Sequence, residues 1–380
     1  MKILLLTTHI NIGGVGLYLL NLAKGLKKRG VKCFVASSGG NLERYFKTAR
    51  ISLVNLDIKT KFEFNPKLIP GIFKLIRFVK KNDIDIIHAH TRVTQVLGRL
   101  ISKFTTLKRR TSLTGQAKPH FVTTCHGFFK SERLSRRLFP CWGEATIAIS
   151  QAVKTHLIND FNLPENRISL IYNGIDLEEP SKVLTEEEKE LLKENLRLGK
   201  GPVIGSIGRL SPVKGYKYLL FAMKDLKNVI PDVKLLIIGE GPSGNKLRDL
   251  SKKLNLEDSV SFVKATLDVR RFLTLMDIFV FPSIQEGLGL SLIEAMASGK
   301  VCIATSIGGI SSVIEDGKNG LLVQPGDSHS LTEAMRRLLL DKELFSRLGS
   351  AARNSVKNKF SLDRMMEETI RFYESVKDRD

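Results

Sequence analysis

Two carboxylates, Glu286 and Glu294, flank a glycine-containing segment in the second half of the chain. Gly287 and Gly289 allow the backbone to bend sharply and allow a ligand to approach it closely. From Leu290 onward, apolar residues recur at helical spacing, which predicts a helix that begins near Gly289. Free N–H groups at the start of a helix attract anions. This arrangement suits a ligand with both phosphate and hydroxyl groups, such as a nucleotide sugar.

A second pair of residues, Arg209 and Lys214, lies in a loop that follows a strand-like segment. When the glycosidic bond of a nucleotide sugar breaks, negative charge builds on the leaving phosphate, and cations must meet it. Arginine can hold two phosphate oxygens at once, whereas lysine acts as a point charge. The alternative is a pair of solvated surface cations. The accompanying carboxylate segment favours a phosphate-binding loop.

The first half carries a glycine loop and a histidine that could contribute to the same chemistry. Gly13, Gly14 and Gly16 follow the first predicted strand, but the third glycine of a dinucleotide fingerprint would fall on Leu19. We therefore expect this loop to contact the phosphate side of a sugar donor. His126 follows an apolar strand, and open α/β sheets bind ligands at the carboxyl ends of their strands. This placement predicts an active-site position for His126.

Metal chemistry is not implied by the sequence. His88 and His90 could bind a metal ion, but no third ligand is evident. Asp83 and Asp85 imitate a metal motif, yet they precede a strand and those histidines, so we interpret them as part of a loop. The four cysteines are far apart and are predicted to be free thiols, as expected in a reducing compartment: Cys33, Cys125, Cys141 and Cys302.

These segments resemble, in order, the motifs of the retaining glycosyltransferases of family 4, which have the two-domain GT-B fold. The carboxylate segment is similar to the E-x7-E signature of that family, and the resemblance covers essentially the whole chain. The other matching segments are residues 13–14, 88–90, 126–127, 173–176, 207–215, 236–242 and 278–283. The chain departs from the family at Ser312, where a glutamate is usual, and after Gly14, where a Glu-Arg pair is usual.

The resemblance implies roles for individual residues. Glu286 would hydrogen-bond hydroxyls of the donor sugar, Glu294 would bind the two ribose hydroxyls, and His126 would lie beside the donor sugar and the acceptor. The catalytic set would be His126, Glu286, Arg209 and Lys214. The donor-binding set would be Gly13, Gly14, Gly16, Arg209, Lys214, Gly239, Val263, Lys264, Glu286, Gly287, Leu288, Gly289, Leu290 and Glu294. The nucleotide sugar is a substrate, and neither a cofactor nor a metal ion is expected.

Strand-like apolar runs alternate with helical patterns along the chain, which predicts an α/β fold with parallel sheets. With the resemblance, this pattern predicts a GT-B fold, in which two Rossmann-like doubly wound domains face each other across a cleft. We expect an acceptor domain over residues 1–175 and a nucleotide-sugar donor domain over residues 176–360. Near the boundary, which we expect at about residues 176–201, residues 185–197 are predicted to form a surface helix. The resemblance implies that the terminal helix, residues 361–380, packs back on the first domain.

The formal charge of +21 is concentrated in the first half of the chain. Residues 1–175 contain 29 Lys and Arg against 9 Asp and Glu, whereas residues 176–380 contain 31 against 30. Such a field attracts an anionic partner, namely a membrane leaflet, an acidic lipid-linked acceptor or nucleic acid. Residues 99–137 are especially basic, with aromatic residues between the cations. This pattern favours docking on an anionic membrane surface, with a solvated basic face as the alternative.

No segment is long enough for a membrane span, so we expect a cytoplasmic protein, peripheral on the inner face of the cell membrane. The predicted activity is transfer of a hexose-type sugar from a nucleotide-diphosphate sugar to a lipid-linked or polysaccharide acceptor, in lipopolysaccharide or other cell-surface glycan biosynthesis. One alternative is a basic nucleic-acid-binding protein, which the absence of a known binding motif disfavours. Another is a nucleotide-sugar epimerase or hydrolase on the same fold.

Overall fold

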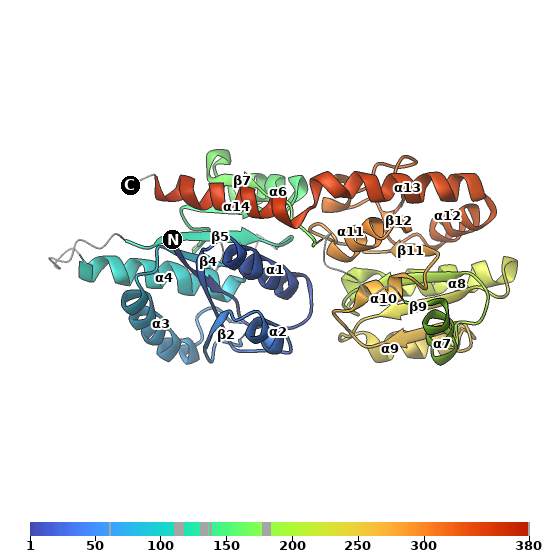
Figure 1. Ribbon diagram of the computed structural model, residues 1–380, viewed down its shortest axis with the longest axis horizontal. Helices are drawn as coiled ribbons and strands as arrows, with labels where there is room; N and C mark the ends of the chain where they lie inside the picture. The colour runs from blue at the N-terminus through green and yellow to red at the C-terminus, as the bar shows by residue number, and fades with distance from the viewer. Residues whose placement is uncertain (61, 110–117, 130–135, 137–138, 177–183, 379–380) are drawn as a thin grey trace. The chain divides into compact units, whose positions relative to one another are not determined.

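The computed structural model describes residues 1–60, 62–109, 118–129, 136, 139–176 and 184–378. The chain forms two compact units (Figure 1). The first unit combines Met1–Gly174 with Leu362–Asp380, and the second unit is Ile175–Ser361. Each unit contains its own parallel sheet flanked by helices, and the predicted α/β class with two Rossmann-like domains is therefore confirmed. Among the described residues, no helix has both the length and the apolar character needed to cross a membrane.

The first unit is built on a seven-stranded parallel sheet with the order β3-β2-β1-β4-β5-β6-β7. Its central strands are buried on both faces, which explains why they appear in the sequence as continuous apolar runs. Strand order reverses between β1 and β4, so ligands of such a sheet bind beyond the carboxyl ends of these two strands. The strands are β1 (Lys2–Leu6), β2 (Lys32–Ser37), β3 (Ser52–Asn55), β4 (Ile86–Ala89), β5 (His120–Cys125), β6 (Ala145–Ala148) and β7 (Ile168–Leu170).

The C-terminal helix α14 belongs to the first unit, where it packs against α1. At the contact, Gly25 of α1 faces the thioether of Met366, and a larger side chain at Gly25 would overlap it. Tyr373 of α14 is fully buried. The helices of this unit are α1 (Gly14–Lys28), α2 (Glu43–Thr48), η1 (Pro66–Leu68), α3 (Ile69–Asn82), α4 (Arg92–Arg109), α6 (Gln151–Phe161), η2 (Glu165–Arg167) and α14 (Leu362–Lys377).

The second unit is built on a six-stranded parallel sheet with the order β10-β9-β8-β11-β12-β13. Here the strand order reverses between β8 and β11, which places the expected ligand crevice beyond the carboxyl ends of those strands. The strands are β8 (Val203–Ile207), β9 (Lys234–Ile238), β10 (Val260–Val263), β11 (Ile278–Phe281), β12 (Val301–Thr305) and β13 (Leu321–Val323).

The helices of the second unit begin and end close to their predicted limits where the sequence carries capping signals. Thr185 caps α7 through a complete capping box with Glu188, as the sequence predicts. The helices are α7 (Glu186–Asn195), η3 (Pro212–Lys214), α8 (Tyr216–Val229), α9 (Gly244–Lys253), α10 (Val269–Leu273), α11 (Leu290–Ala297), η4 (Gly308–Ser312), α12 (Ser328–Leu340) and α13 (Lys342–Lys359).

The structure defines two of the predicted loops. Helix α1 begins at Gly14, so Gly14 and Gly16 lie in its first turn. The preceding strand β1 ends at Leu6, so a loop over residues 7–13 separates it from the helix. Asp83 and Asp85 lie in a loop as expected. Asp83 ends α3 in a left-handed conformation, and the carboxylate of Asp85 accepts the backbone N–H of Lys2 at 2.6 Å.

Candidate active site

In the second unit, the loops that follow β8 and β11 carry the predicted phosphate clamp and the first predicted carboxylate. These are the two strands that flank the reversal of strand order. The ammonium group of Lys214, in η3, donates a hydrogen bond to Glu286 Oε2 and forms an ion pair with it. Lys214 Nζ also lies 4.9 Å from the ring centroid of Phe281 at the end of β11. The two charged side chains are 21% and 17% exposed, so they remain accessible to a ligand.

Arg209 lies in the same loop as Lys214, but its surroundings are different. Its side chain is exposed, and it forms no hydrogen bond or ion pair with another residue that the structure describes. The guanidinium group is therefore available to an anion from solvent. Lys264 is also exposed, in the segment that follows Val263 and β10.

Glycines position the loop after β8 by direct backbone contact. Gly215 has φ +67°, and a Cβ atom at this position would overlap the carbonyl oxygen of Pro282, just after β11. Gly239 packs in the same way against the carbonyl of Gly208. Because no side chain fits at either contact, both glycines are required to bring these loops together. Gly239, a predicted donor-binding residue, therefore has a packing role that its sequence pattern did not distinguish.

The start of helix α11 presents backbone N–H groups beside Glu286. Gly289 caps the helix with φ +91° and offers no side-chain hydrogen bond, so N–H groups of the first turn, such as that of Leu290, lack a helical partner. Ser291 Oγ donates a 2.8 Å hydrogen bond to the carbonyl of Ile207, which fixes α11 against β8. Glu294 lies one turn into α11 and is half-buried. The residues Gly287, Leu288 and Gly289 are buried.

The loop after β12 supports this carboxylate segment. The N–H group of Gly309 donates to the carbonyl of Glu286 at 3.2 Å, and a side chain at Gly309 would overlap the carbonyl of Gly287. Ser312, where the resembling family usually has a glutamate, ends the short helix η4. Its carbonyl accepts a 2.8 Å hydrogen bond from Lys359 Nζ.

In the first unit, three histidines form a cluster at the carboxyl ends of β4 and β5. His88 hydrogen-bonds Tyr373 Oη through Nδ1 and Thr124 Oγ1 through Nε2, each at 2.7 Å, so both of its nitrogens have a partner. His90 Nδ1 lies 3.2 Å from His126 Nε2. His90 Nε2 is buried and has no hydrogen-bond partner among the described residues. In the sequence, His90 and His126 follow two different predicted strands. Their interaction shows that the ends of these two strands lie next to each other.

Burial controls the protonation of this cluster. Removal of the rings from water lowers the pKa of His88 and of His126 to about 3, and it lowers the pKa of His90 well below the ordinary value. Neighbouring imidazoles lower the pKa values of His88 and His90 further. All three rings are therefore neutral at physiological pH. Within the described part of the chain, no group of three or more acidic, histidine or cysteine side chains could hold a metal ion.

The glycine loop divides into two parts with different roles. Gly13 and Gly14 are exposed at the start of α1, and a Cβ atom at either would meet nothing within 4 Å. A ligand could therefore approach the free N–H groups at the start of α1. Gly16 is buried, and a side chain there would overlap the carbonyl of Asn11. Gly16 thus packs α1 against its own preceding loop.

Sequence reasoning missed Tyr18 as part of the histidine cluster. The buried ring of Tyr18 meets His126 edge-on, with centroids 4.8 Å apart, and its centroid is 5.6 Å from that of His90. Desolvation raises the pKa of Tyr18 to about 12, and its buried hydroxyl has no hydrogen-bond partner among the described residues. The helical spacing of Tyr18 with apolar residues of α1 indicates only that it faces inward, so the sequence carries no signal for this contact.

Part of the predicted basic stretch, residues 99–137, lies outside the described residues, including Arg110, Lys130, Glu132, Arg133, Leu134 and Arg137. Phe121 of β5 is buried, and the other described phenylalanines in or next to the stretch divide into two groups. Phe104 and Phe139 are exposed. Phe128 and Phe129 are half-buried, and Phe129 stacks with the Arg136 guanidinium, 4.4 Å from its ring centroid.

Two parallel-sheet units that carry their candidate loops where strand order reverses define a GT-B glycosyltransferase. Family comparisons agree with this class, because residues 12–179 match the model for Glycosyltransferase Family 4 and residues 187–355 match that for Glycosyl transferases group 1. The chain is 30% identical over 313 residues to the Escherichia coli UDP-Gal:alpha-D-GlcNAc-diphosphoundecaprenol alpha-1,3-galactosyltransferase, covering 78% of this chain and 76% of that relative. The chain therefore belongs to the family 4 glycosyltransferases and is a transferase of class EC 2.4.

Two further comparisons extend over nearly the whole chain. The chain is 27% identical over 385 residues to the Bacillus anthracis N-acetyl-alpha-D-glucosaminyl L-malate synthase, covering 98% of this chain and 97% of that relative. Its fold is shared with Anabaena HepE, whose crystal structure is in complex with UDP and glucose. That structure has a TM-score of 0.85 and 24% sequence identity, and the match covers 99% of this chain and 100% of HepE.

Proposed function

We propose that this protein is a retaining glycosyltransferase that moves a hexose-type sugar from a nucleoside-diphosphate sugar to a lipid-linked or polysaccharide acceptor in cell-surface glycan biosynthesis. The observation that carries this proposal is the Lys214–Glu286 ion pair in the loops at the reversal point of the second sheet, with Arg209, whose side chain has no partner in the described part of the chain, in the same loop as Lys214. Support also comes from the Escherichia coli relative, whose name specifies UDP-Gal as donor and a diphosphoundecaprenol-linked acceptor.

The donor enters this site by exchanging partners with the ion pair. A diphosphate that reaches Lys214 replaces the carboxylate of Glu286, and Arg209 supplies a second cation. Glu286 is then free to accept hydrogen bonds from hydroxyls of the sugar. The negative charge on the leaving phosphate grows as the glycosidic bond breaks, and the two cations stabilise that charge. Glu294, one turn along α11, accepts hydrogen bonds from the two ribose hydroxyls.

The configuration at the sugar C1 is retained if the acceptor attacks from the face that the nucleotide leaves. The bond between the sugar C1 and the phosphate oxygen breaks, and the acceptor oxygen forms its bond to C1 on that same face. The leaving phosphate takes the proton of the acceptor hydroxyl, so no protein side chain has to act as the base. This division of labour agrees with His126, because burial lowers its pKa to about 3 and so makes its neutral ring a weak base.

The hydrogen bonds of the histidine cluster favour one tautomer of His126. If His126 Nε2 carried the proton, it would donate to His90 Nδ1, and His90 would hold a buried Nε2–H without a partner. His90 Nε2 lacks a partner among the described residues in either arrangement, but a buried donor is left unsatisfied less often in proteins than a buried acceptor. In the other arrangement, His90 Nδ1–H donates to His126 Nε2, and His126 carries its proton on Nδ1. His90 is therefore the positioning residue, and His126 offers an N–H donor to a sugar hydroxyl.

An aromatic surface on the first unit supports attachment to an anionic membrane. Glu63 is half-buried and forms an ion pair with Arg92 at 3.2 Å, and Arg92 also donates to the carbonyl of Phe139 at 2.7 Å. The neighbouring Phe62 and Phe64 are 73% and 55% exposed, and the ring centroids of Phe64 and Phe139 are 5.4 Å apart.

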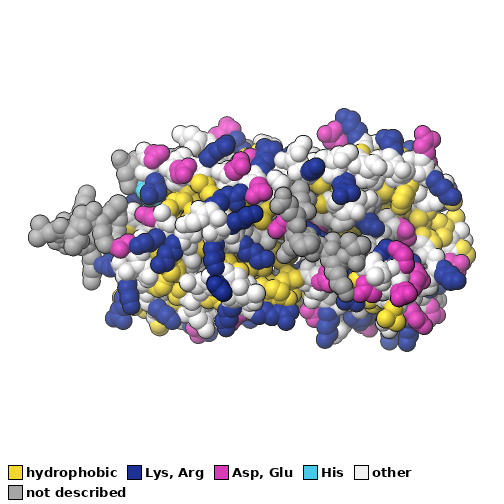
Figure 2. Space-filling model, viewed as in Figure 1, with side chains coloured by type: hydrophobic (Ala, Val, Ile, Leu, Met, Phe, Trp, Pro, Cys, Tyr) yellow, Lys and Arg dark blue, Asp and Glu magenta, His cyan; other side chains and the backbone are white. Residues whose placement is uncertain are grey.

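On the helix α3 that follows, Ile69 and Phe73, one turn apart, are also exposed. On the face of the first unit that Figure 2 shows, lysine and arginine side chains lie among hydrophobic patches. Aromatic residues among cations insert into the headgroup region of anionic leaflets. We propose the aromatic surface, defined as Phe62, Phe64, Ile69, Phe73 and Phe139, as the membrane-docking face.

Thermal denaturation with UDP, GDP, ADP and a short oligonucleotide tests the donor assignment. A ligand at about 100 times its dissociation constant adds about 2.7 kcal/mol to the free energy of unfolding. We expect one nucleoside diphosphate to stabilise the protein and Lys214→Ala to abolish that effect. Stabilisation by the oligonucleotide alone would contradict the proposal. Product analysis with the matching nucleotide sugar then distinguishes transfer to an acceptor from hydrolysis of the donor or epimerisation of its sugar.

A further inference from the structure

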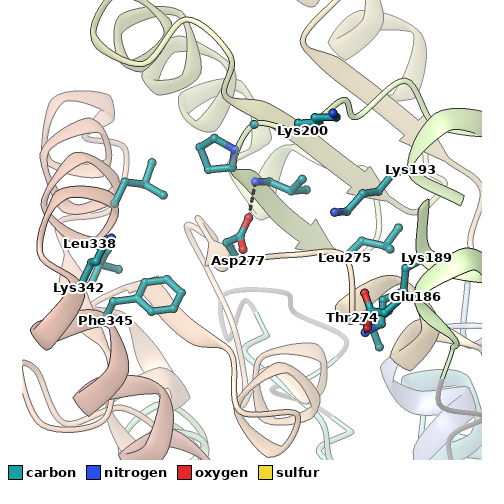
Figure 3. Close-up of a pocket in the computed structure, with 14 residues that line it drawn as sticks. Glu186, Lys189, Lys193, Lys200, Thr274, Leu275, Asp277, Leu338, Lys342 and Phe345 are labelled. Carbon is teal, nitrogen blue, oxygen red and sulfur yellow. Dashed lines mark hydrogen bonds and ion pairs between the residues drawn. The ribbon is translucent and has the colours of Figure 1, made fainter. Parts of the chain in front are cut away.

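A cavity of about 510 Å³ lies at the amino-terminal edge of the second sheet. Its lining comes from α7, from the starts of β8 and β11, and from the segment around the α12–α13 junction. Figure 3 shows Lys189 and Lys193 of α7 on one side of the cavity, and Lys342 and Phe345 of α13 on the other. The volume lies within the usual range for small-molecule sites, roughly 300–1,000 Å³.

This cavity is separate from the donor loops. Lys214 and Glu286 lie in loops beyond the carboxyl ends of β8 and β11, whereas the cavity contacts Val203 and Asp277 at the opposite ends of these strands. Strand β8 has five residues. At about 3.3 Å per residue, the two positions are separated by roughly 15 Å of strand. One small ligand therefore cannot occupy both.

Cations dominate the lining. Lys189, Lys193, Lys200 and Lys342 face two carboxylates, those of Glu186 and Asp277. Lys200 and Lys342 form no hydrogen bond or ion pair with another described residue. Since residues 176–380 as a whole are nearly neutral, with 31 basic against 30 acidic residues, this excess is local.

The carboxylates do not neutralise these lysines firmly. Asp277 Oδ2 already accepts the backbone N–H of Val203 at 2.7 Å. Lys189 pairs with Glu186, whose side chain is 83% exposed, and Lys193 pairs at 3.1 Å with the exposed Glu190. Exposed pairs three residues apart on a helix contribute little free energy, so an incoming anion can replace these carboxylates.

A further cation lies behind the lining. The ammonium group of Lys300 donates a 2.7 Å hydrogen bond to the carbonyl of Met276. Burial lowers its pKa, the carboxylate of Asp277 acts in the opposite direction, and the ammonium of Lys189 lowers the pKa further. Lys189 and Lys300 therefore repel each other, and an anion bound near Lys189 relieves that repulsion.

Apolar side chains also line the cavity: Leu338 and the half-buried Phe345 lie on the same side as Lys342, and Leu275 lies on the side of Lys193 (Figure 3). An anion with an apolar portion fits a site in which cations alternate with apolar side chains. We propose that this cavity binds a phosphorylated small molecule, with its phosphate groups on Lys193, Lys200 and Lys342 and its apolar portion against Leu275 and Phe345. The phosphate could come from a free nucleoside polyphosphate or from a prenyl diphosphate, and the two sources share the same recognition chemistry.

Lysine acetylation followed by mass spectrometry tests this site in the full-length protein. Inorganic tripolyphosphate, ATP and geranyl diphosphate are compared as probes. We expect each probe that binds to slow acetylation of Lys193, Lys200 and Lys342, while Lys252 and Lys253, exposed on α9, react at unchanged rates. Protection by ATP alone would identify the nucleotide source, and protection by geranyl diphosphate alone the prenyl source. Equal rates at all five lysines with and without every probe would overturn the proposal.

Calorimetric titration with the protective probe separates this cavity from the donor site. In a Lys214→Ala background, which weakens the donor site, binding should persist. Adding Lys193→Ala and Lys342→Ala should weaken it by about tenfold or more, because two charge-assisted contacts are lost. The matched control is Lys252→Ala with Lys253→Ala, which should leave the affinity unchanged. Loss of binding in the Lys214→Ala background alone, or equal weakening by the control pair, would contradict a separate site.

Discussion

At the scale of single residues, the candidate site combines side chains that are available to a ligand with side chains whose hydrogen bonds are already formed within the protein. The side chain of Arg209 has no partner among the described residues, and Lys214 is paired with Glu286. By contrast, both nitrogens of His88 are engaged, so this histidine is a structural residue. The sequence identifies all of these residues by type and position. It does not indicate which ones hold each other in the absence of ligand, because that depends on contacts between distant loops.

Replacement of Lys214 tests the phosphate clamp. We expect Lys214→Ala to lower the rate of sugar transfer by on the order of 10²-fold, because it removes a cation that meets the charge of the leaving phosphate. Lys217→Ala is a matched control, since Lys217 is an exposed lysine on the neighbouring helix α8. Steady-state transfer assays of the two purified variants make the comparison. Wild-type rates in a folded Lys214→Ala protein would remove Lys214 from the mechanism.

The histidine cluster makes the first unit sensitive to acid. The pKa of His88 is about 3 in the folded state, below its unfolded value of about 6.5, so below pH 6.5 the unfolded chain binds a proton that the folded chain does not. Stability is therefore complete above pH 6.5 and falls as the pH is lowered toward 3. At pH 5 the loss is on the order of 2 kcal/mol for His88 alone.

Fluorescence of Trp142 measures this effect selectively, because Trp142 is the single tryptophan of the chain and is buried in the first unit. Denaturant titrations at pH 7, 6 and 5 should show a falling midpoint. Paired carboxylates titrate mostly below this window, so they contribute little to the change. A constant midpoint from pH 7 to pH 5 would mean that the imidazoles accept protons in the folded state without cost.

At the scale of elements, the sites depend on strand order and on glycines that allow loops to touch. Alternating strand and helix patterns are sufficient to predict parallel sheets, and the Thr185–Glu188 capping box predicts the start of α7. The strands β7 and β13 have three residues each and are too short to give a periodic signal. Such patterns also do not show which strands pair. The points at which strand order reverses, where the candidate loops meet, were therefore identified only from the structure.

Gly215 provides a test of loop positioning with a closely matched control. Gly215 has φ +67° and Gly317 has φ +69°, but a Cβ atom at Gly215 would overlap the carbonyl of Pro282, while one at Gly317 would meet nothing within 4 Å. Alanine at either position costs about 1–2 kcal/mol for the left-handed backbone. We expect Gly215→Ala to cost a further 1–3 kcal/mol, roughly, for the overlap.

Denaturant unfolding followed by circular dichroism compares the free energies of unfolding of Gly215→Ala and Gly317→Ala. Because Gly215 directly follows Lys214, its displacement should also weaken nucleotide binding, whereas Gly317→Ala should bind normally. Equal destabilisation by the two substitutions would show that the loop adjusts to a side chain at Gly215. The tight contact with Pro282 would then not be what positions the clamp.

At the scale of the whole molecule, the sequence predicts an uneven distribution of charge but not the surface that uses it. Nearly all of the excess positive charge lies in residues 1–175. The basic stretch, residues 99–137, predicts a docking surface that includes its own aromatic residues, yet Phe128 and Phe129 are half-buried. The strongly exposed aromatic residues lie at positions 62–73, where few cations are adjacent in sequence. Their exposure accompanies the ion pair of the half-buried Glu63 with Arg92, a contact between distant segments.

Membrane attachment through the aromatic surface can be measured by co-sedimentation with vesicles. We expect binding to vesicles that contain anionic lipid, weak binding to neutral vesicles, and release by added salt, because the basic first unit supplies the attraction. Serine at Phe62, Phe64 and Phe73 together should lower the affinity strongly, since burial of each ring contributes about 1.5–3 kcal/mol.

The control is serine at three similarly exposed apolar residues of the second unit, Leu191, Val229 and Leu340, which are 60%, 55% and 62% exposed. If both triple variants lose affinity equally, or if neutral vesicles bind as well as anionic ones, the first unit does not direct attachment. Loss confined to the Phe62, Phe64 and Phe73 variant would assign the docking face to these aromatic residues, with the surrounding charge as the long-range attraction.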